Sequence, residues 1–546
     1  MKFFRFLILA ILELSMGLFF QAQIYYVSTN GSDANNGNIN APWLTIQFAI
    51  DQVQPGDTIF VRSGTYNEYV IFNQSGNSGQ PIILSGYPNE LVVLDGNNLN
   101  WRYGIDLSEN DNLVIQDLTI RDYIRDGLRG FGVVGWGSNN NIIVKNLVLS
   151  LVGTPIKFAA AGSEISSNIE IKNITAFSYD GAGIDLGPER IANVLIQNVI
   201  LDGPMGGSDT SVDGIAVEDG DTISIQNVIL RGHAGDGVDL KADNVTVQQV
   251  DARYYARDGA KLWGQNVLLE NSIFLGGVLE GLTLPGAGPY VIRNNIFGIA
   301  NGYGYTAVIG PYESNTPSSQ ATLIGNIFYT PQNQGTLIYL SPAVSLNASH
   351  NVYYSPNRED AVITAYINGQ SQSFSKDQIN DSTWSQNINT DQNSRFLDPL
   401  FLDVGNINFQ LQSSSALIDQ IPSNLVSNID LLGRLRPNGL NSDIGPYEYY
   451  GSQSTPIVSN ILKKKSQRFV LRILGNNFQS GLKVYVGGLN IQWNNVVYKD
   501  SNEIRLKKGK RYFPKDGAFV LIKIVNPDGQ QVVVAYDSLA KSWKTI

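Results

Sequence analysis

An acidic residue followed by glycine recurs through the middle of the chain, and its later copies are evenly spaced. The phrase begins at six positions: Asp126, Asp180, Asp213, Asp236, Asp258 and Glu280. The last four copies are 23, 22 and 22 residues apart. Because stacked strands lie about 4.8 Å apart, residues in register would form a column of carboxylates at that spacing. Such a column is repulsive unless cations or bound protons compensate it.

Basic residues crowd the same repeats. Alignment of the repeats places Asp239 beside Lys261. It also places Lys241 between Glu218 and Trp263, about 5 Å from each across the stack. Lys241 and Lys261 would then extend from one face at the centre of the repeat array. We therefore expect a patch of paired charges there.

A patch of this composition suits the cleavage of an anionic polysaccharide by β-elimination. In that reaction a base removes the proton α to a uronate carboxyl, and positive charge stabilises the enediolate that forms. Burial or neighbouring cations lower the pKa of a lysine or arginine enough for it to act as base. The candidate catalytic residues are Lys241, Lys261 and Arg257.

Carboxylates in the same repeats favour a bound cation, because calcium prefers oxygen ligands. The candidate calcium ligands are Asp213, Asp236, Asp239 and Asp258. The candidate substrate-binding residues are Arg231, Arg253, Trp263 and His233. The two arginines would add to the basic patch, Trp263 would stack on a sugar ring, and His233 would assist near Asp236.

Three other interpretations of the same residues remain open. Asp-Gly is a common corner dipeptide in which glycine takes positive φ, and paired Lys and Asp on a sheet simply neutralise each other. A glycoside hydrolase could draw its acid and base from Asp213, Asp236, Asp239 and Glu218. A non-catalytic surface or adhesive protein could use the repeats as a rigid carbohydrate-binding platform.

A second repeating phrase shows which elements carry these residues. Short β-branched segments end in a polar residue, as in residues 196–198, 225–227, 247–249, 269–271 and 292–294. A fixed period in the twenties indicates rungs that bury their apolar faces only against their neighbours. The sequence therefore predicts an all-β fold, a parallel β-helix with polar stacks of asparagine inside it or at its corners.

The ends of the chain differ from the repeats in composition. Residues 1–22 predict a secretory signal peptide, since Lys2 and Arg5 precede a short apolar run, and no later stretch is apolar enough to span a bilayer. The chain has no cysteine, so disulfides and thiolate metal sites are excluded. We expect the mature protein to be secreted or held at the cell surface.

Charge divides the chain into two parts. Residues 451–546 contain 16 Lys and Arg against 5 Asp and Glu, a net charge of +11. The remainder therefore carries −21 of the total formal charge of −10. An acidic solenoid and a basic tail indicate two domains with different partners, and nucleic acid is excluded as a ligand of the solenoid.

These observations predict six successive segments. They are a signal peptide (1–22), an N-terminal cap with the first rungs (23–91), the β-helix (92–395), its closing segment (396–450), a linker (451–456) and a small β-sandwich (457–546). The acids of the closing segment are expected to form turns and caps.

Residues 24–66, a strand, a loop, a short helix around Ala49–Asp51 and a first rung, resemble the N-terminal cap of right-handed parallel β-helix proteins related to pectate lyases. Family 9 polysaccharide lyases carry Asp-Gly-x-x-x-Lys in one coil and Asp-Asp-Gly-x-Asp-Leu-Trp in the next. Residues 236–241 fit the first phrase, and residues 257–263 resemble the second, with Arg257 and Lys261 where acids would be expected. The resemblance implies a lyase with Lys241 as base, in which only Asp258 of residues 257–263 keeps the position of a calcium ligand; calcium is therefore expected as an optional cofactor.

The last domain has its own resemblance. Residues 475–478, 487–488 and 525–529 are similar to turns of the immunoglobulin-like domains called IPT/TIG. Domains of that family space, dock or bind, and they do not catalyse.

Overall fold

A computed structural model describes most of the chain. The described residues are 21–125, 128–160, 162–188, 190–203, 212–299, 305–310, 319–331, 336–356, 362–405, 407–451, 456–463, 469–486, 491–509, 512–513, 519–526, 530–537 and 540–545. The predicted signal peptide, the Asp126-Gly127 copy of the repeat and most of the predicted linker lie outside them. Among the described residues, no helix has the length and apolarity needed to cross a bilayer.

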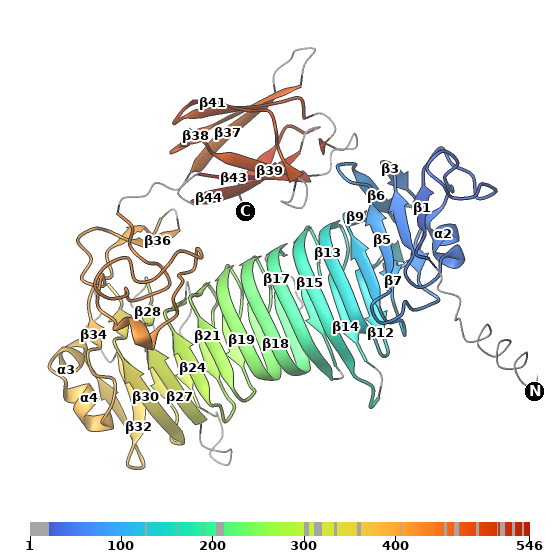
Figure 1. The fold of residues 1–546 in the computed structure, drawn as a ribbon. Helices are drawn as coiled ribbons and strands as arrows, with labels where there is room; N and C mark the ends of the chain where they lie inside the picture. Colours follow the sequence, from blue (N-terminus) through green and yellow to red (C-terminus); the bar gives the residue numbers. More distant parts are fainter. Residues whose placement is uncertain are drawn as a thin grey trace, which may run out of the picture.

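Stacked parallel strands form a long solenoid (Figure 1). Their pairings run along it in three parallel series, which we call the first, second and third sheets. The strands of the first sheet are β1 (Ile24–Val27), β2 (Thr58–Val61), β5 (Ile82–Gly86), β8 (Leu113–Gln116), β13 (Asn140–Ser150), β15 (Ser166–Phe177), β17 (Ile191–Asp202), β18 (Ile215–Arg231), β19 (Val238–Arg253), β21 (Val267–Glu270), β24 (Tyr290–Arg293), β27 (Ser319–Ile324) and β30 (Val344–Ser349). The strands from β13 to β19 are long because they bend round a corner and continue into a second sheet.

The second sheet begins and ends with short strands. They are β3 (Gly64–Tyr66), β6 (Val92–Asp95), β9 (Thr119–Arg121), β22 (Ile273–Leu275), β25 (Ile296–Gly298), β28 (Ile327–Tyr329), β31 (Val352–Tyr354) and β34 (Arg395–Phe396). The third sheet contains β4 (Val70–Ile71), β7 (Tyr103–Asp106), β12 (Phe131–Trp136), β14 (Thr154–Ala159), β16 (Ile184–Leu186), the first residues of β18 and β19, β20 (Ala260–Leu262), β23 (Leu282–Leu284), β26 (Ala307–Ile309), β29 (Ile338–Leu340) and β32 (Ile363–Ile367). The predicted all-β solenoid is confirmed.

Inward-facing apolar residues fill the centre of each rung. In β18, the alternating residues Ile223 and Ile225 are buried between exposed or half-buried neighbours. A stack of rings, Phe274, Phe297 and Phe328, continues this core along the second sheet with centroids 5.9 and 5.7 Å apart. Because every rung presents the same face to the next, stability accumulates along the stack.

Asparagines at the corners form two ladders, as the sequence predicts. The ladder between the third and first sheets consists of Asn112, Asn141, Asn168 and Asn193. At the corner between the first and second sheets, Asn173 donates to Asn146 at 2.8 Å, and Asn198 donates to Asn173 at 3.0 Å. The residues of this ladder have positive φ, for example 55° at Asn173. Asparagine tolerates the left-handed region better than most side chains, so it turns the corner and pairs with the next rung at once.

A third ladder is buried inside the C-terminal half of the solenoid. Asn295, Asn326 and Asn351 are all fully buried. Asn326 donates to the backbone oxygen of Ile292 at 2.8 Å and to the side-chain oxygen of Asn351 at 3.2 Å. Its own oxygen accepts from both the backbone and the side chain of Asn295. Every polar atom of the Asn326 side chain therefore has a partner.

Replacing Asn326 with alanine should lower the free energy of unfolding by roughly 2–5 kcal/mol, because it leaves several buried backbone and amide groups unpaired. The midpoint of guanidinium unfolding measures the change. Asn387→Ala is the control, since Asn387 is an exposed helical residue and its loss should cost no more than about 0.5 kcal/mol. Equal midpoints for the two variants would contradict a structural role for the buried ladder.

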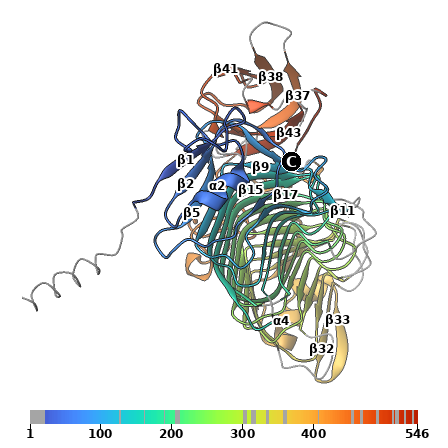
Figure 2. The same cartoon turned by 90° about the vertical axis from the view of Figure 1, so that its right-hand side faces the viewer.

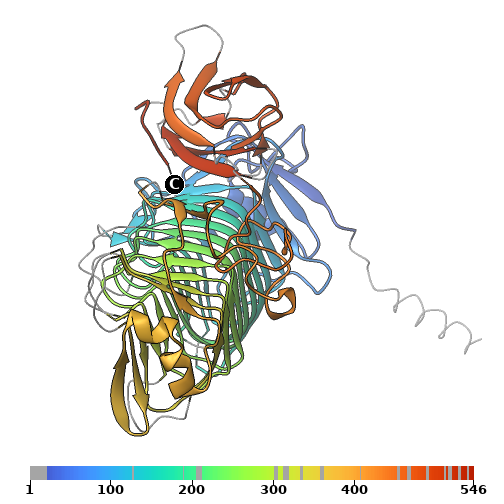
Figure 3. The same cartoon turned by 90° about the vertical axis from the view of Figure 1, so that its left-hand side faces the viewer.

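Caps close both ends of the solenoid (Figures 2 and 3). The helix α2 (Ile46–Gln52) covers the N-terminal end, begins at the N-cap Thr45 and buries Ile46, Ala49 and Ile50. At the other end lie β33 (Gln370–Phe374), α3 (Lys376–Asn380) and α4 (Thr383–Ile388). The segment that follows contains β35 (Phe401–Asp403), β36 (Asn408–Leu411) and the 3-10 turn η1 (Ser423–Leu425), and it packs over the side of the second sheet against Ile273, Ile296 and Ile327. The hairpin of β10 (Ile124–Arg125) and β11 (Leu128–Arg129) projects from an early rung.

The C-terminal residues form two antiparallel sheets that share one apolar core. The first sheet contains β37 (Ile457–Lys463), β38 (Val470–Asn476), β42 (Glu503–Lys507) and β41 (Val496–Asp500), and the second contains β40 (Ile491–Gln492), β39 (Lys483–Val486), β43 (Phe519–Val525), β44 (Gln531–Asp537) and β45 (Trp543–Thr545). The two sheets form a small β-sandwich.

The sandwich packs against the solenoid rather than extending from it (Figure 1). Leu521 and Val533 of the sandwich form one buried apolar cluster with Ile200 of the solenoid. Phe519 contacts Phe177 edge to face, with ring centroids 6.2 Å apart. These contacts lie on the second sheet, so the third sheet is left uncovered by the sandwich.

Candidate functional site

The third sheet brings the charged residues of several rungs together. Strand pairing aligns Lys157 with Asp185, and Asp185 with Ala216 in the next rung. It then aligns Ala216 with Asp239, and Asp239 with Lys261. The predicted register of Asp239 and Lys261 is therefore observed, and these residues form one outward-facing column on the sheet.

The acid–glycine phrases form a second column at the start of the same strands. The carboxylate of Asp213 accepts the backbone N–H of Asp236 at 2.7 Å, and that of Asp236 accepts the N–H of Asp258 at 2.9 Å. Asp258 accepts the N–H of Glu280 at 3.1 Å in the same way. Each acid thus binds the next rung with one oxygen and keeps the other oxygen for further contacts.

Close backbone packing explains the glycine in each phrase. A side chain on Gly214 would place its Cβ 2.5 Å from the backbone oxygen of Gly237. Gly237 and Gly259 meet the next rung just as closely, at 2.5 and 2.4 Å. None of these three glycines has positive φ, so the expected left-handed turn is wrong, and the requirement is for space.

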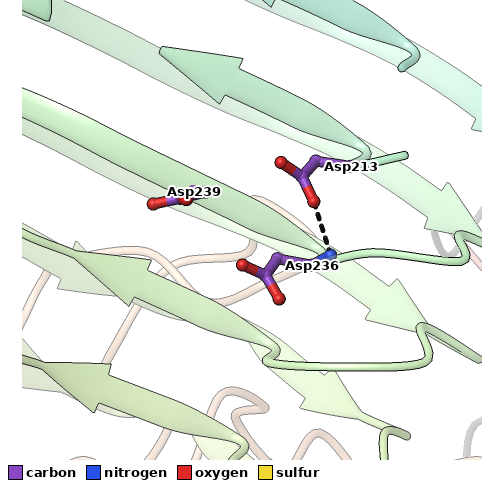
Figure 4. Close-up of side chains that lie close together, drawn as sticks. All are labelled: Asp213, Asp236 and Asp239. Carbon is purple, nitrogen blue, oxygen red and sulfur yellow. Dashed lines mark hydrogen bonds between the residues drawn. The ribbon is translucent and has the colours of Figure 1, made fainter. Parts of the chain in front are cut away.

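Three carboxylates converge where the two columns meet (Figure 4). Each of Asp213, Asp236 and Asp239 offers an oxygen, and these oxygens all lie within 4.8 Å of one another. Burial, followed by the charges of Asp236 and Asp239, raises the pKa of Asp213 to about 7. Burial and the charge of Asp258 raise the pKa of Asp236 to about 6. The triad therefore holds negative charge that its surroundings do not fully compensate.

Basic side chains surround the triad. The amino group of Lys261 lies 3.7 Å from Asp236 and 3.9 Å from Asp239, and its side chain is only 17% exposed. Arg257 approaches Asp236 at 3.9 Å from a more exposed position. Lys261 is thus a neighbour of the triad without a close ion pair to any one carboxylate.

Lys241 lies on the same face but is paired differently. Its amino group donates to Glu218 at 2.6 Å and lies 3.5 Å from Asp239. Burial lowers the pKa of Lys241, but the hydrogen bonds and charges of Glu218 and Asp239 outweigh burial, so this pKa is raised overall. Lys241 therefore holds its proton firmly.

These residues line a cleft of about 350 Å³. Its charged lining contains four cations and five carboxyl groups: Lys157, Lys241, Arg257, Lys261, Asp185, Asp213, Glu218, Asp236 and Asp239. Trp263 stands at its edge, where the indole N–H donates to Asp239 at 2.9 Å and the ring lies 5.4 Å from the Lys261 amino group. Trp263 is 38% exposed.

Asp258 lies outside the triad of converging oxygens. It shares a hydrogen bond with the side chain of Glu280, and burial together with this bond raises the pKa of Glu280 to about 8. Glu280 is therefore mostly protonated in neutral solution and can donate to Asp258. The prediction of Asp258 as a calcium ligand is not supported by this geometry.

The two predicted substrate-binding arginines lie on a different sheet. Arg231 and Arg253 are aligned in the second sheet and both bind Asp251, at 3.1 Å for Arg231. Arg253 also donates to the backbone oxygen of Ile407 in the closing segment. The prediction that these arginines lie at the cleft is wrong. Strands β18 and β19 begin in the third sheet and turn a corner before they reach Arg231 and Arg253 in the second sheet.

His233 is buried and does not line the cleft. It is 1% exposed, and its ring nitrogen is 2.7 Å from the hydroxyl of Tyr179 inside the solenoid. Burial, reinforced by the charge of Arg231, lowers the pKa of His233 to about 3. The side chain is a neutral core residue, and its predicted role at the site was wrong.

Sequence reasoning missed Lys157 and Asp185, which line the cleft and form an ion pair at 2.7 Å. The cause is an error of register. The pairing of Ile184 with Ile215 aligns Gly183, not Gly181, with Gly214. Asp180 is instead an exposed partner of Arg129. The usable signal was the phrase Ile-Asp-Leu at 184–186, which matches Val-Asp-Leu at 238–240.

Two known families match the solenoid. A family described as a Pel9A-like, right handed beta helix region matches residues 25–186, and one described as a right handed beta helix region matches residues 213–394. The solenoid is a right-handed parallel β-helix. A solved structure of XylC in complex with xylose shares the fold, with a TM-score of 0.51 at 11% identity, over 79% of this chain and 99% of that chain.

Curated relatives match shorter stretches of this β-helix protein. It is 34% identical over 127 residues to the uncharacterized protein YwoF of Bacillus subtilis, covering 22% of this chain and 27% of the relative. It is 34% identical over 125 residues to pectate lyase PEL9 of Emericella nidulans, covering 21% of this chain and 30% of the relative. The chain thus spans less than a third of these relatives' length.

Proposed function

We propose that this β-helix protein cleaves an acidic polysaccharide by β-elimination in the cleft of the third sheet. The observation that carries the proposal is the position of Lys261, a weakly paired lysine directly beside three converging carboxylates. A uronate bound there would present its α proton to the lysine and its carboxyl group to positive charge. The named similarity to a pectate lyase supports the same class of substrate.

Lys261 suits the role of base better than Lys241. A general base must release its proton to solvent and then take one from the substrate. Lys241 is held protonated by Glu218, which suits it to binding a substrate carboxylate. The Lys261 amino group is no closer than 3.7 Å to Asp236 and 3.9 Å to Asp239, so no close ion pair among the described residues holds it as Glu218 holds that of Lys241.

Calcium fits the triad by the chemistry of its donors. Asp213 and Asp236 each bind a backbone N–H with one oxygen, which leaves the other oxygen for further contacts, and calcium prefers carboxylate oxygens over other ligands. A bound calcium ion would supply Lewis-acid stabilisation of the negative charge that develops on the uronate carboxyl. The excess of carboxyl groups over cations in the cleft gives a further reason for a cation, since a polyuronate would otherwise be repelled.

The proposed elimination conserves atoms and electrons and needs no oxidant or reductant. Lys261 removes the proton at the carbon α to the carboxyl group, and the electron pair of that bond moves toward the carboxyl group. The pair then forms a carbon–carbon double bond as the glycosidic oxygen leaves, that oxygen takes up a proton from water, and Lys261 returns the proton that it removed to solvent. Arg257 and Lys241 lie where they can hold the uronate carboxyl during both steps.

The proposal includes export, because residues 1–22 predict a signal peptide and a polysaccharide substrate is extracellular. The C-terminal sandwich, whose sequence resembles IPT/TIG domains partly through residues 487–488 and 527–529 outside the described residues, would then serve as a spacer or binding domain rather than a second catalytic unit. Residues 451–546 carry net positive charge, so the sandwich differs in charge from the acidic β-helix.

A glycoside hydrolase is the second candidate, favoured by the pKa of Asp213. A carboxyl group with a pKa of about 7 is partly protonated in neutral solution and can act as general acid. Its carboxylate neighbours within 4.8 Å are close enough for a retaining mechanism, which uses carboxyl groups about 5 Å apart.

Absorbance of the unsaturated uronide distinguishes the two reactions. Purified protein should produce this absorbance from pectate, alginate or a glycosaminoglycan, and chelation of calcium should abolish it. New reducing ends without the absorbance would indicate hydrolysis and overturn the proposal. Binding without either product would indicate a non-catalytic platform.

A further inference from the structure

Aromatic side chains occupy the N-terminal rungs of the same sheet that carries the cleft. Trp101, Tyr103, Phe131 and Trp136 are each partly exposed, and Tyr69 is 36% exposed. The rings form a continuous series in which each contacts the next: Tyr69 with Trp101 at 4.3 Å between centroids, Trp101 with Tyr103 at 6.3 Å, Tyr103 with Phe131 at 5.6 Å, and Phe131 with Trp136 at 5.8 Å. We call these five residues the aromatic strip.

The strip continues the columns of the cleft. Strand pairing aligns Tyr103 with Phe131, and Phe131 with Thr154. Two rungs further along the solenoid, the same column contains Asp213. The same outward positions of the third sheet thus carry rings in the first rungs and acids in the middle rungs. A chain lying along the solenoid axis over the cleft would therefore pass over the strip.

Lys157 joins the two regions. It lines the cleft and pairs with Asp185 at 2.7 Å, while its amino group lies 6.0 Å from the ring centroid of Trp136. From Lys157 to Lys261 the column crosses four rung spacings, or about 19 Å. Through Lys157, the charged cleft and the strip are therefore in contact on the same sheet.

We propose that the aromatic strip forms additional subsites for the same polysaccharide, where the apolar faces of sugar rings stack on Tyr69, Trp101 and Trp136. This inference rests on the proposed function for its substrate class. Aromatic rings offer large apolar faces at low entropic cost, and exposed apolar surface continuous with a polar cleft marks a binding groove. The strip extends the groove toward the N-terminal cap, so it contributes to binding of long chains and not of short ones.

The test measures binding of pectate and alginate in two lengths, long polymers and tetrasaccharides, by calorimetry. All variants carry Lys261→Ala in the full-length protein so that the polymer is not cleaved during the titration. The double variant Tyr69→Ala, Trp101→Ala should weaken binding of the long polymer about tenfold, as expected for lost ring stacking. Its affinity for the tetrasaccharide should stay within about twofold.

Two controls keep the result interpretable. Trp101→Phe retains an aromatic face and should retain polymer binding within about threefold, which separates loss of stacking from loss of fold. Tyr498→Ala removes a tyrosine that is also 36% exposed but lies in the C-terminal sandwich, and it should change nothing.

Long-polymer binding that is unchanged in the double variant overturns the inference, even if elimination occurs as proposed. A wild-type dimer that the double variant dissociates, seen by sedimentation, also overturns it, because the strip would then join two copies of the chain. Strip-dependent polymer binding, together with no unsaturated product from the protein that retains Lys261, supports the inference and removes the proposed lyase activity.

Discussion

Replacement of Lys261 with alanine should reduce kcat for elimination by roughly 10²- to 10⁴-fold, the usual contribution of a general base. The side chain is mostly buried beside the triad, and no other lysine lies as close to Asp236 among the described ion pairs. KM should change little by comparison, because the removed group acts on the reacting proton. Initial rates of unsaturated-uronide formation, measured at saturating pectate, give the effect directly.

Lys172→Ala is the matched control for this experiment. Lys172 pairs with Glu170 at 2.7 Å on the first sheet, away from the cleft, and its loss should leave the rate within about twofold. Lys241→Ala should raise KM more than it lowers kcat, since Lys241 is assigned to substrate binding. The assignment of the base fails if Lys241→Ala abolishes turnover while Lys261→Ala retains it.

Calcium affinity should rise by roughly 100- to 1,000-fold between pH 5 and pH 8, because the ligands must lose their protons before they bind the ion. The pKa of Asp213 is about 7 and that of Asp236 is about 6, so both deprotonate within this window. Titration of the protein with calcium at several pH values, followed by calorimetry, measures the change. Asp213→Asn should weaken binding at pH 8 and flatten the pH dependence.

The same pKa shifts have a consequence for stability without calcium. Both carboxyl groups bind protons more tightly in the folded state than in the unfolded state, where their pKa is about 3.9. Their contribution to stability is therefore lost as pH rises from about 4 to about 7. In chelator, the melting temperature of the wild type should fall over this range relative to that of Asp213→Asn. If the melting temperatures of the two proteins change equally with pH, the raised pKa of Asp213 is contradicted.

Much of the fold was predictable because a solenoid repeats its local rules. Apolar alternation, corner asparagines and the 22-residue spacing each recur in rung after rung, so one irregular copy does not obscure the pattern. The pairing of Asp239 with Lys261 followed from this regularity alone. The sequence also predicts asparagine stacks such as that of Asn326 with Asn351, but it does not show which asparagines lie inside the solenoid.

The site was less predictable because function depends on which sheet a residue faces. Arg231 and Arg253 lie close to the acid–glycine phrases in sequence, but a corner turns them onto the second sheet. Lys157 and Asp185 lie much farther away in sequence, yet the stack brings them into the cleft. Rung lengths vary in this region, so distance along the chain does not give the register.

The docked position of the C-terminal sandwich fixes the direction in which the protein presents its cleft. The sandwich contacts the second sheet and, through Lys523, lies beside the corner ladder of Asn173 and Asn198. In a three-sided coil that corner is opposite the third sheet. A molecule tethered by its last domain to a cell wall or a particle would therefore hold its cleft outward, toward polymers in the surrounding medium.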